Sequence, residues 1–332
     1  MHAPSPLTTS VLIPSFGRPE RLARCLRALG EQTVAPRQVV VVWQGDDEAT
    51  RLVAERLRDV APYQLDVIHS DQVSVVAAEN GALAAATGQI VLLIEDDAVP
   101  PNDWVARHVA HYADPRIGAV GGPADNHRPD GAPFPRRAAE PVGRLTWYGR
   151  AIGNLYDHDD RWRTRPPREV DHLVGNNMSL RRVAFDRFEA GLRPYWQMFE
   201  LDACLQVKAR GYRVVCDFAN VVAHHPTNLA YAGGRDGDLQ IKVYHAAYNQ
   251  AFVLAKHSPG ALRVWRALYV VLVGSTGAPG LLASLVAVGR YGHPGRELRI
   301  LARTWRHAFS GWRAGAAATN AHVAVVPIEG AS

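Results

Sequence analysis

Short apolar runs alternate with amphipathic stretches along the front of the chain. Runs rich in Val, Ile and Leu, typical of strands buried on both faces, lie at residues 10–14, 38–43, 65–68, 90–94 and 117–121. Segments with apolar residues at helical spacing fall between them, at residues 19–30, 75–86 and 104–112. This alternation predicts an α/β fold, with a mostly parallel sheet of nucleotide-binding type flanked by helices.

The pattern changes twice after this front part. Residues 126–168 are rich in Pro, Arg and Gly and lack periodicity, so we expect a long functional loop, part of which folds over a substrate. A strand at 170–174, a helix at 201–210 and a strand at 212–216 follow. From residue 239 the pattern is helical, which predicts two domains: a catalytic α/β domain at 1–238 and a basic, amphipathic helical region at 239–332.

Charge is distributed unevenly along the 332 residues. From Ile241 onward there are ten Lys/Arg and two Asp/Glu, a net charge of +8 against +5 for the whole chain, so the front part is slightly acidic. The apolar stretch at 267–288 is broken by Gly and Pro into pieces too short to span a bilayer, which requires about 20 residues. The helix at 296–313 is amphipathic and basic. It indicates either a subdomain packed on the core or peripheral attachment to an anionic membrane.

The cysteines and the N-terminus bear on location. Three scattered cysteines without a CxxC pair argue against a disulfide framework or a zinc site. The first ten residues have neither a basic segment nor a long apolar one, unlike a secretory signal. We expect a cytoplasmic protein, with peripheral attachment to the inner face of the membrane as the alternative. Nucleic acid is not an expected partner, because the basic residues lie in the amphipathic tail.

Three consecutive acids, Glu95, Asp96 and Asp97, follow the apolar run at 90–94. Ligands of open α/β sheets bind beyond the carboxyl ends of the strands, where these acids are expected. Adjacent carboxylates repel one another, which favours a bound cation, and Mg²⁺ or Mn²⁺ prefer carboxylate oxygens and bridge to phosphates. An exposed turn with a helix cap is the alternative interpretation.

Five motifs in order resemble inverting glycosyltransferases of family 2, which have the GT-A fold. They are VLIPSFGR at 11–18, the strand at 39–42 with an acidic turn behind it, NGAL at 80–83 with the acids Glu95–Asp97, GNNMSLRR at 175–182, and the segment from Glu200 through GYRV at 211–214 to His224. The resemblance covers roughly residues 8–228. It implies transfer of a sugar from a nucleotide-diphosphate sugar to an acceptor hydroxyl, in cell-envelope polysaccharide, glycolipid or natural-product glycoside synthesis.

The resemblance also implies metal ligands. Glu95 and Asp97 would hold Mn²⁺ or Mg²⁺, which offsets the charge that builds on the diphosphate leaving group. His224 would complete the coordination shell, or would instead make a structural hydrogen bond. Asp96 would contact the ribose or brace the turn. Because the family usually has Asp at the first of these positions, we expect Asp97 to be a ligand more firmly than Glu95.

Glu200 occupies the position of the family's catalytic aspartate, counted back from Gly211. A carboxylate there would act as general base toward the acceptor hydroxyl. Asp202, on the same short segment, is the alternative base, and capping of the following helix is the structural alternative for both. Tyr195 and Trp196, just upstream, would stack on an acceptor sugar or else lie in the core.

The expected donor-binding residues follow the first two strands and the fourth motif: Pro14, Ser15, Arg18, Trp43, Asp46, Asp96 and Asn177. The family usually has Asp where this chain has Trp43, so the family pattern does not specify which nucleobase the donor carries. We expect a UDP-sugar, with GDP- and dTDP-sugars as alternatives. The acceptor is a hydroxyl compound, and a lipid-linked one suits a basic tail. The departures at Trp43, Glu79 and Phe199 support one other function, a catalytically impaired protein that binds sugar nucleotides or carbohydrate.

Overall fold

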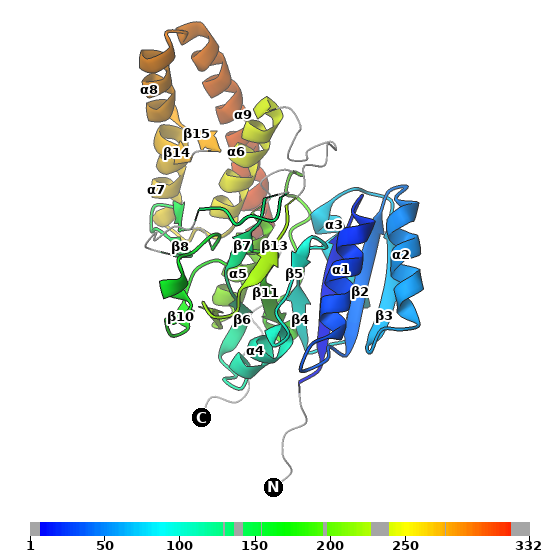
Figure 1. The fold of residues 1–332 in the computed structure, drawn as a ribbon. Coiled ribbons are helices and arrows are strands. Elements are labelled where there is room, and N and C mark those ends of the chain that lie inside the picture. The colour runs from blue at the N-terminus through cyan, green and yellow to red at the C-terminus, as the bar shows by residue number, and fades with distance from the viewer. Residues whose placement is uncertain are drawn as a thin grey trace. The chain divides into compact units, whose positions relative to one another are not determined.

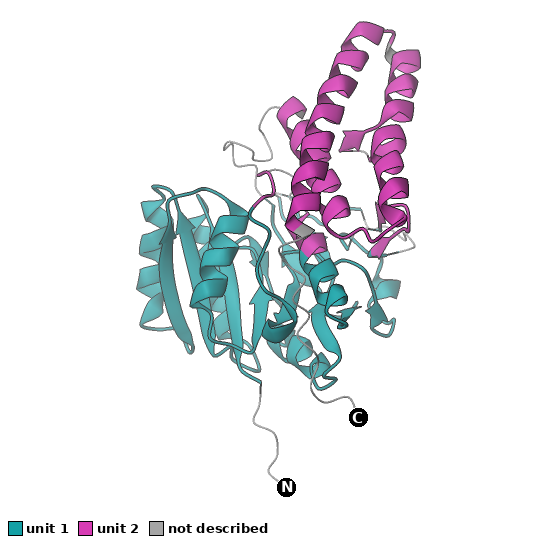
Figure 2. Ribbon diagram, turned by 180° about the vertical axis from the view of Figure 1, so that it is seen from behind, with its two compact units in different colours: residues 1–143, 153–190, 203–227 teal, residues 144–152, 191–202, 228–332 magenta. Residues whose placement is uncertain are grey.

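A computed structural model describes residues 7–128, 130–135, 142–153, 155–194, 198–226, 239–275 and 277–319. The chain divides into two compact units (Figure 2). Unit 1 comprises residues 1–143, 153–190 and 203–227, and unit 2 comprises residues 144–152, 191–202 and 228–332. Unit 2 thus adds two earlier segments to the C-terminal region predicted from the sequence. The domain boundary at residue 238 stays a prediction.

An eight-stranded sheet forms the centre of unit 1 (Figure 1). Its strands are β1 (Thr9–Ser15), β2 (Gln38–Gln44), β3 (Gln64–Ser70), β4 (Ile90–Leu93), β6 (Ile117–Gly121), β10 (Arg168–Glu169), β11 (Met178–Arg181) and β12 (Arg213–Cys216). They are ordered β10-β12-β6-β11-β4-β1-β2-β3. The run from β4 to β3 is parallel, as is the pair β6–β12, whereas β11 is antiparallel to both of its neighbours. The predicted α/β fold is therefore confirmed, with a mixed sheet.

Helices cover this sheet at the positions that the sequence predicts. They are α1 (Pro19–Gly30), α2 (Glu48–Arg58), α3 (Val75–Ala85), α4 (Trp104–His111) and α5 (Phe199–Ala209). Local chemistry sets several of their starts. Pro19 opens α1, where its fixed φ suits the first turn, and the side chains of Asp47 and Ser74 accept backbone N–H bonds from Thr50 and Ala77 to cap α2 and α3.

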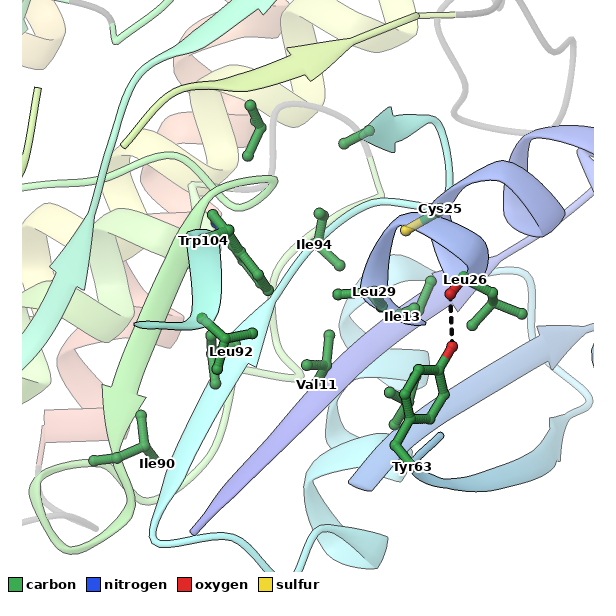
Figure 3. Close-up of a cluster of buried hydrophobic side chains, with 14 of the residues drawn as sticks. Val11, Ile13, Cys25, Leu26, Leu29, Tyr63, Ile90, Leu92, Ile94 and Trp104 are labelled. Atoms are coloured by element: carbon green, nitrogen blue, oxygen red, sulfur yellow. Dashed lines mark hydrogen bonds between the residues drawn. The ribbon is translucent and has the colours of Figure 1, made fainter. Parts of the chain in front are cut away.

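The core of unit 1 lies between the parallel strands and α1 (Figure 3). Val11 and Leu92, from neighbouring strands, are fully buried beside Trp104 of α4. The hydroxyl of Tyr63 reaches into this layer and donates a hydrogen bond of 2.7 Å to the Leu26 carbonyl, which satisfies a polar group that would otherwise be costly to bury. This packing fixes the carboxyl ends of β1 and β4 next to each other.

The predicted strand at 170–174 is wrong. Residues 170–174 form no strand and lie between β10, which ends at Glu169, and β11, whose Met178 pairs with both Leu93 and Gly121. The backbone amides of Val170 and Asp171 bond to the carbonyls of Val214 and Gly143 instead of a regular ladder. The segment is apolar because it is largely buried, and burial alone does not specify a strand.

A three-stranded sheet completes the part of unit 1 that matters for function. It consists of β5 (Ala98–Val99), β13 (Val222–His224) and β7 (Ala124–Asn126), with β13 in the middle. His224 pairs with Ala98 on one side and with Asn126 on the other. Because Ala98 directly follows the acidic triplet, this pairing brings His224 to the end of β4.

Unit 2 is largely helical, in agreement with the prediction of a helical C-terminal region. Its elements are α6 (Leu239–Lys256), α7 (Leu262–Leu268), a π-helical turn (Tyr269–Val273), β14 (Gly274–Ser275), β15 (Ala278–Pro279), α8 (Leu281–Tyr291) and α9 (Pro294–Thr319), with β8 (Arg144–Leu145) and β9 (Ala151–Ile152) from the predicted long loop. In the same predicted loop, unit 1 holds β7, β10 and a 3₁₀ helix at Asp160–Trp162.

Glycines allow α9 to approach α6 closely. A Cβ atom at Gly311 or Gly315 would lie 2.1 Å from the carbonyl oxygen of Tyr248 or Phe252, so larger residues are excluded there. Within the described ranges, no helix is both long and apolar enough to cross a membrane.

Candidate active site

Glu95, Asp97 and His224 gather at the carboxyl end of β4. Each offers one ligand atom, and these atoms lie within 4.8 Å of one another. His224 Nε2 is 3.3 Å from Glu95 Oε2 and 3.3 Å from Asp97 Oδ1. The structure therefore brings together the three residues that the sequence predicts as metal ligands, and it does so through the β5–β13 pairing.

Asn126 orients the imidazole of His224. The Asn126 side-chain amide donates to Asp157, which leaves its Oδ1 to accept a hydrogen bond of 2.7 Å from His224 Nδ1. Nδ1 therefore carries a proton, and Nε2 faces the two carboxylates. Fixing the tautomer through the outer ring nitrogen is how proteins usually prepare a histidine to bind a metal. Sequence reasoning missed Asn126, which lies at the start of the segment interpreted as a loop.

Two atoms of this cluster lack a hydrogen-bond partner. Asp97 Oδ1 and His224 Nε2 are buried and make no hydrogen bond of regular geometry, although they lie 3.3 Å apart and form an ion pair when the imidazole is protonated. Burial alone would raise the pKa of Asp97, but the neighbouring His224 and Arg18 outweigh it and hold that pKa below its usual range. Burial would lower the pKa of His224, yet Asp97 and Glu95 raise it to about 9. A buried carboxylate oxygen and a buried imidazole nitrogen without hydrogen bonds, beside the half-buried carboxylate of Glu95, fit a divalent cation such as Mn²⁺ or Mg²⁺.

Asp96 points into a different set of contacts. Ser15 Oγ donates to Asp96 Oδ2 at 2.6 Å, and Arg18 Nη2 lies 2.8 Å from Asp96 Oδ1. Burial raises the pKa of Asp96 to about 7, although Arg18 opposes the shift. Arg18 also pairs with Asp97 Oδ2. Of the two roles left open by the sequence, these contacts support a brace at the turn, and Arg18 links both acids to the end of β1.

Of the residues predicted to contact the donor at the ends of β1 and β2, only some lie next to one another. Ser15 pairs in register with Trp43, whose ring stacks on His69 with centroids 3.8 Å apart, and Pro14 pairs with Val42. Asp46 is exposed to solvent. Its neighbour Asp47 accepts the backbone N–H of Gly17, so Asp47 rather than Asp46 connects the two turns. The acidic turn itself was the only sequence signal for this contact.

Asn177 is buried within unit 1. Its Nδ2 donates to the carbonyls of Pro123 and Asn220 at 2.9 and 2.7 Å, and its Oδ1 accepts from Trp104 Nε1 at 2.8 Å. These contacts join α4, β11 and the segment before β13. They give Asn177 a bracing role and do not support the predicted contact with the donor.

The two candidate bases lie in the first turn of α5. Glu200 is half-buried, whereas Asp202 is fully buried. Lys256 Nζ lies 2.9 and 3.1 Å from the two oxygens of Asp202, and His257 Nε2 lies 2.8 Å from Oδ1. Burial would raise the pKa of Asp202, but these two partners lower it below the usual range. Tyr195 and Trp196, the predicted acceptor residues, lie outside the described residues.

Comparisons with known proteins identify the family of this chain. Residues 10–188, more than half of the chain, match the family model "Glycosyl transferase family 2". The chain is 27% identical over 124 residues to glycosyltransferase AglE of Haloferax volcanii, covering 37% of this chain and 41% of that protein. It is 29% identical over 122 residues to the succinoglycan biosynthesis protein ExoM of Rhizobium meliloti, covering 36% of this chain and 39% of that protein. The chain thus spans about two fifths of these relatives' length.

Solved structures show the same fold at lower identity. The mannosyltransferase PcManGT of Pyrobaculum calidifontis, in complex with GDP-Man and Mn²⁺, has a TM-score of 0.53 and 18% identity, covering 96% of this chain and 89% of that one. GalNAc-T7 with UDP, GalNAc and Mn²⁺ has a TM-score of 0.52 and 15% identity, covering 80% and 55%. The fold is that of the GT-A glycosyltransferases, and by its sequence match this chain belongs to glycosyl transferase family 2.

Proposed function

We propose that this protein transfers a sugar from a nucleotide-diphosphate sugar to an acceptor hydroxyl, with inversion at the anomeric carbon and with a divalent metal. One observation carries the proposal: Asp97 Oδ1 and His224 Nε2 are buried, lack hydrogen-bond partners and stand beside Glu95 at the carboxyl end of β4. This edge of an α/β sheet is where phosphate-bearing ligands bind.

Glu95, Asp97 and His224 would hold the metal, which supplies charge neutralisation to a diphosphate leaving group. Arg18 keeps Asp97 in place by pairing with its other oxygen, Oδ2, and Ser15 anchors Asp96 behind it. A UDP-sugar is the proposed donor, with GDP- and dTDP-sugars as alternatives. The similar solved structures with UDP and with GDP-Man, both with Mn²⁺, support this class of donor.

We assign the general base to Glu200. Asp202 is fully buried, and its close contacts with Lys256 and His257 lower its pKa, so the carboxylate is poorly suited to accept a proton. In the proposed reaction the acceptor oxygen attacks the anomeric carbon and gives its proton to the Glu200 carboxylate, while the bond from that carbon to the diphosphate oxygen breaks and the nucleoside diphosphate leaves. A single displacement of this kind inverts the configuration at that carbon.

Thermal unfolding with and without Mn²⁺, across UDP-, GDP- and dTDP-sugars, tests the proposal. We expect one donor to raise Tm only in the presence of metal, because a ligand bound to the native state stabilises it. Asp97→Ala should abolish this metal-dependent rise. Asp59→Ala, which removes an exposed carboxylate of the same unit, is the matched control and should keep it.

Two results would contradict the proposal. One is a metal-dependent rise in Tm that persists in Asp97→Ala. The other is the absence of any donor-dependent rise with the intact triad. The anomeric configuration of the product, read by NMR, tests inversion separately, and a retained configuration would overturn that part alone.

A further inference from the structure

Unit 2 exposes far more apolar surface than unit 1. Among the described residues, eighteen large apolar side chains are exposed, and thirteen of them belong to unit 2 although it is the smaller unit. Eleven of the thirteen fall between residues 264 and 309. Scattered exposed apolar residues are normal, but such a concentration marks an interaction surface.

Helix α8 presents its apolar face outward. Leu282, Leu285 and Val286 are 54%, 53% and 70% exposed, and their spacing places them on one face of the helix. Ser284 is instead buried at 6%. A helix of a water-soluble subdomain normally has the reverse arrangement, with the apolar stripe inward. The exposed face of α8 is therefore suited to contact an apolar phase.

The apolar face continues on α7 and the π-helical turn. Trp265, Leu268 and Leu272 recur at helical spacing and are all exposed. α7, the β14–β15 pair and α8 follow one another along one side of unit 2, and α9 runs back along the other (Figure 1). Trp147 stands edge-on to Trp265 with ring centroids 5.7 Å apart, and both rings are exposed. Exposed tryptophans are typical of the boundary between lipid and water.

Charge identifies the occupant of this surface. Residues 239–296 contain no Asp or Glu, and the whole segment from Ile241 has a net charge of +8. On α9, Arg296, Arg299, Arg303 and Arg306 are exposed at helical spacing. A second copy of the chain would bring two strongly positive surfaces together, and these would repel each other. An anionic surface would instead attract the positive charge.

We propose that unit 2 docks on the face of an anionic phospholipid membrane through the exposed apolar side chains of α7, the π-helical turn and α8, with the exposed arginines of α9 adding electrostatic attraction. The apolar side chains enter the headgroup boundary, and the arginines pair with lipid phosphates. Stable peripheral binding generally needs two such signals together. Since no described helix is able to span a bilayer, the contact is peripheral, and it does not depend on the transferase chemistry.

Flotation of the full chain with lipid vesicles tests the inference. We expect the protein to float with vesicles that contain phosphatidylglycerol, not with vesicles of phosphatidylcholine alone, and to be released as salt is raised. Leu285→Glu with Val286→Glu should abolish flotation. Val60→Glu with Val183→Glu is the matched control, since both residues are exposed apolar side chains of unit 1. Arg299→Gln, Arg303→Gln and Arg306→Gln together should weaken flotation, whereas Arg56→Gln with Arg58→Gln should not.

Three outcomes would overturn the inference. The first is an unaltered chain that does not float with anionic vesicles at low salt. The second is flotation that survives Leu285→Glu with Val286→Glu. The third is a dimer in light scattering that these two substitutions convert to a monomer without any vesicle binding, which would make the surface an interface between copies. Thermal shifts with the nucleotide sugar remain a separate readout of the proposed chemistry.

Discussion

Each unit of the molecule buries a cluster of polar side chains around an aspartate, and the two clusters differ in which polar atoms they leave without a hydrogen bond. In unit 1, Asp97 pairs with Arg18 through Oδ2, but its Oδ1 and the facing Nε2 of His224 make no hydrogen bond of regular geometry. In unit 2, both oxygens of Asp202 are taken up by Lys256, and His257 adds a further contact. Similar burial thus serves two different purposes.

This difference distinguishes a ligand-binding site from a cluster whose role is structural. Buried charge is costly, so it persists where partners offset the cost or where a ligand does so. A saturated cluster such as that of Asp202 has its compensation within the fold. A cluster with orphan ligand atoms, such as that of Asp97 and His224, has part of its compensation outside the polypeptide, which is why we place the metal there.

The largest expected effect separates Glu200 from Asp202 within one turn of α5. Glu200→Gln should lower kcat by about 10²–10⁴-fold, the usual contribution of a general base, because an amide cannot take the acceptor proton. The donor-dependent rise in Tm should remain, since the change leaves the metal ligands intact. Steady-state kinetics with the donor identified by thermal shift measures the first, and the shift itself measures the second.

Glu31→Gln, an exposed neutralisation in unit 1, is the control and should leave kcat unchanged. If Glu200→Gln retains its activity while a folded Asp202→Asn protein is inactive, the base is Asp202. The comparison between open and saturated clusters would then fail as a guide to function.

The next effect breaks the saturated cluster. Asp202→Asn should lower the free energy of unfolding by about 3–5 kcal/mol, because it leaves the Lys256 ammonium buried without its counter-charge. Urea denaturation followed by circular dichroism measures the change. Adding Lys256→Met to Asp202→Asn should restore part of the stability, since an apolar chain of similar length replaces the unpaired charge.

Asp59→Asn serves as the exposed control and should change stability by less than about 0.5 kcal/mol. A loss below about 1 kcal/mol in Asp202→Asn would show that the buried pairing contributes little.

The smallest expected effect concerns a buried histidine that is uncharged and whose two ring nitrogens both have hydrogen-bond partners. His108 is enclosed in unit 1, with Nδ1 2.8 Å from Ser179 Oγ and Nε2 3.2 Å from Asn177 Oδ1. Burial lowers its pKa from 6.5 to about 4. Between these values the unfolded chain takes up the proton and the folded protein does not, so stability is complete above pH 6.5 and falls as the pH falls toward 4.

At about 1.4 kcal/mol per pH unit, the loss attributable to His108 reaches about 3 kcal/mol. Urea denaturation over this pH range should show it, and His108→Asn should flatten that part of the profile. An unchanged slope in His108→Asn would assign the acid sensitivity to other groups.

Local patterns in the sequence were enough to predict the alternation of strands and helices, the acidic end of β4 and the helical C-terminal region. The reason is that burial on two faces, helical spacing and turn chemistry are each written within a few consecutive residues. The resemblance to the family also pointed to Glu95, Asp97 and His224 as metal ligands, but the spacing of residues could only place the first two together. The strand wrongly predicted at 170–174 shows the limit of local patterns. An apolar run indicates that a segment is buried, but not which segment its backbone bonds to.

Tertiary structure decided whatever depends on which distant segments meet. The pairing of β5, β13 and β7 brings His224 and Asn126 to the acids, and no local signal encodes that pairing. Lys256 and His257 saturate Asp202 from 54 and 55 residues away, and this is why we assign the base to the other candidate, Glu200. Hydrophobic periodicity likewise indicated an amphipathic tail, but only the packed helices show that α8 buries a serine and exposes its leucines. Sequence determines which side chains are available, and non-local packing determines which of their atoms remain unpaired.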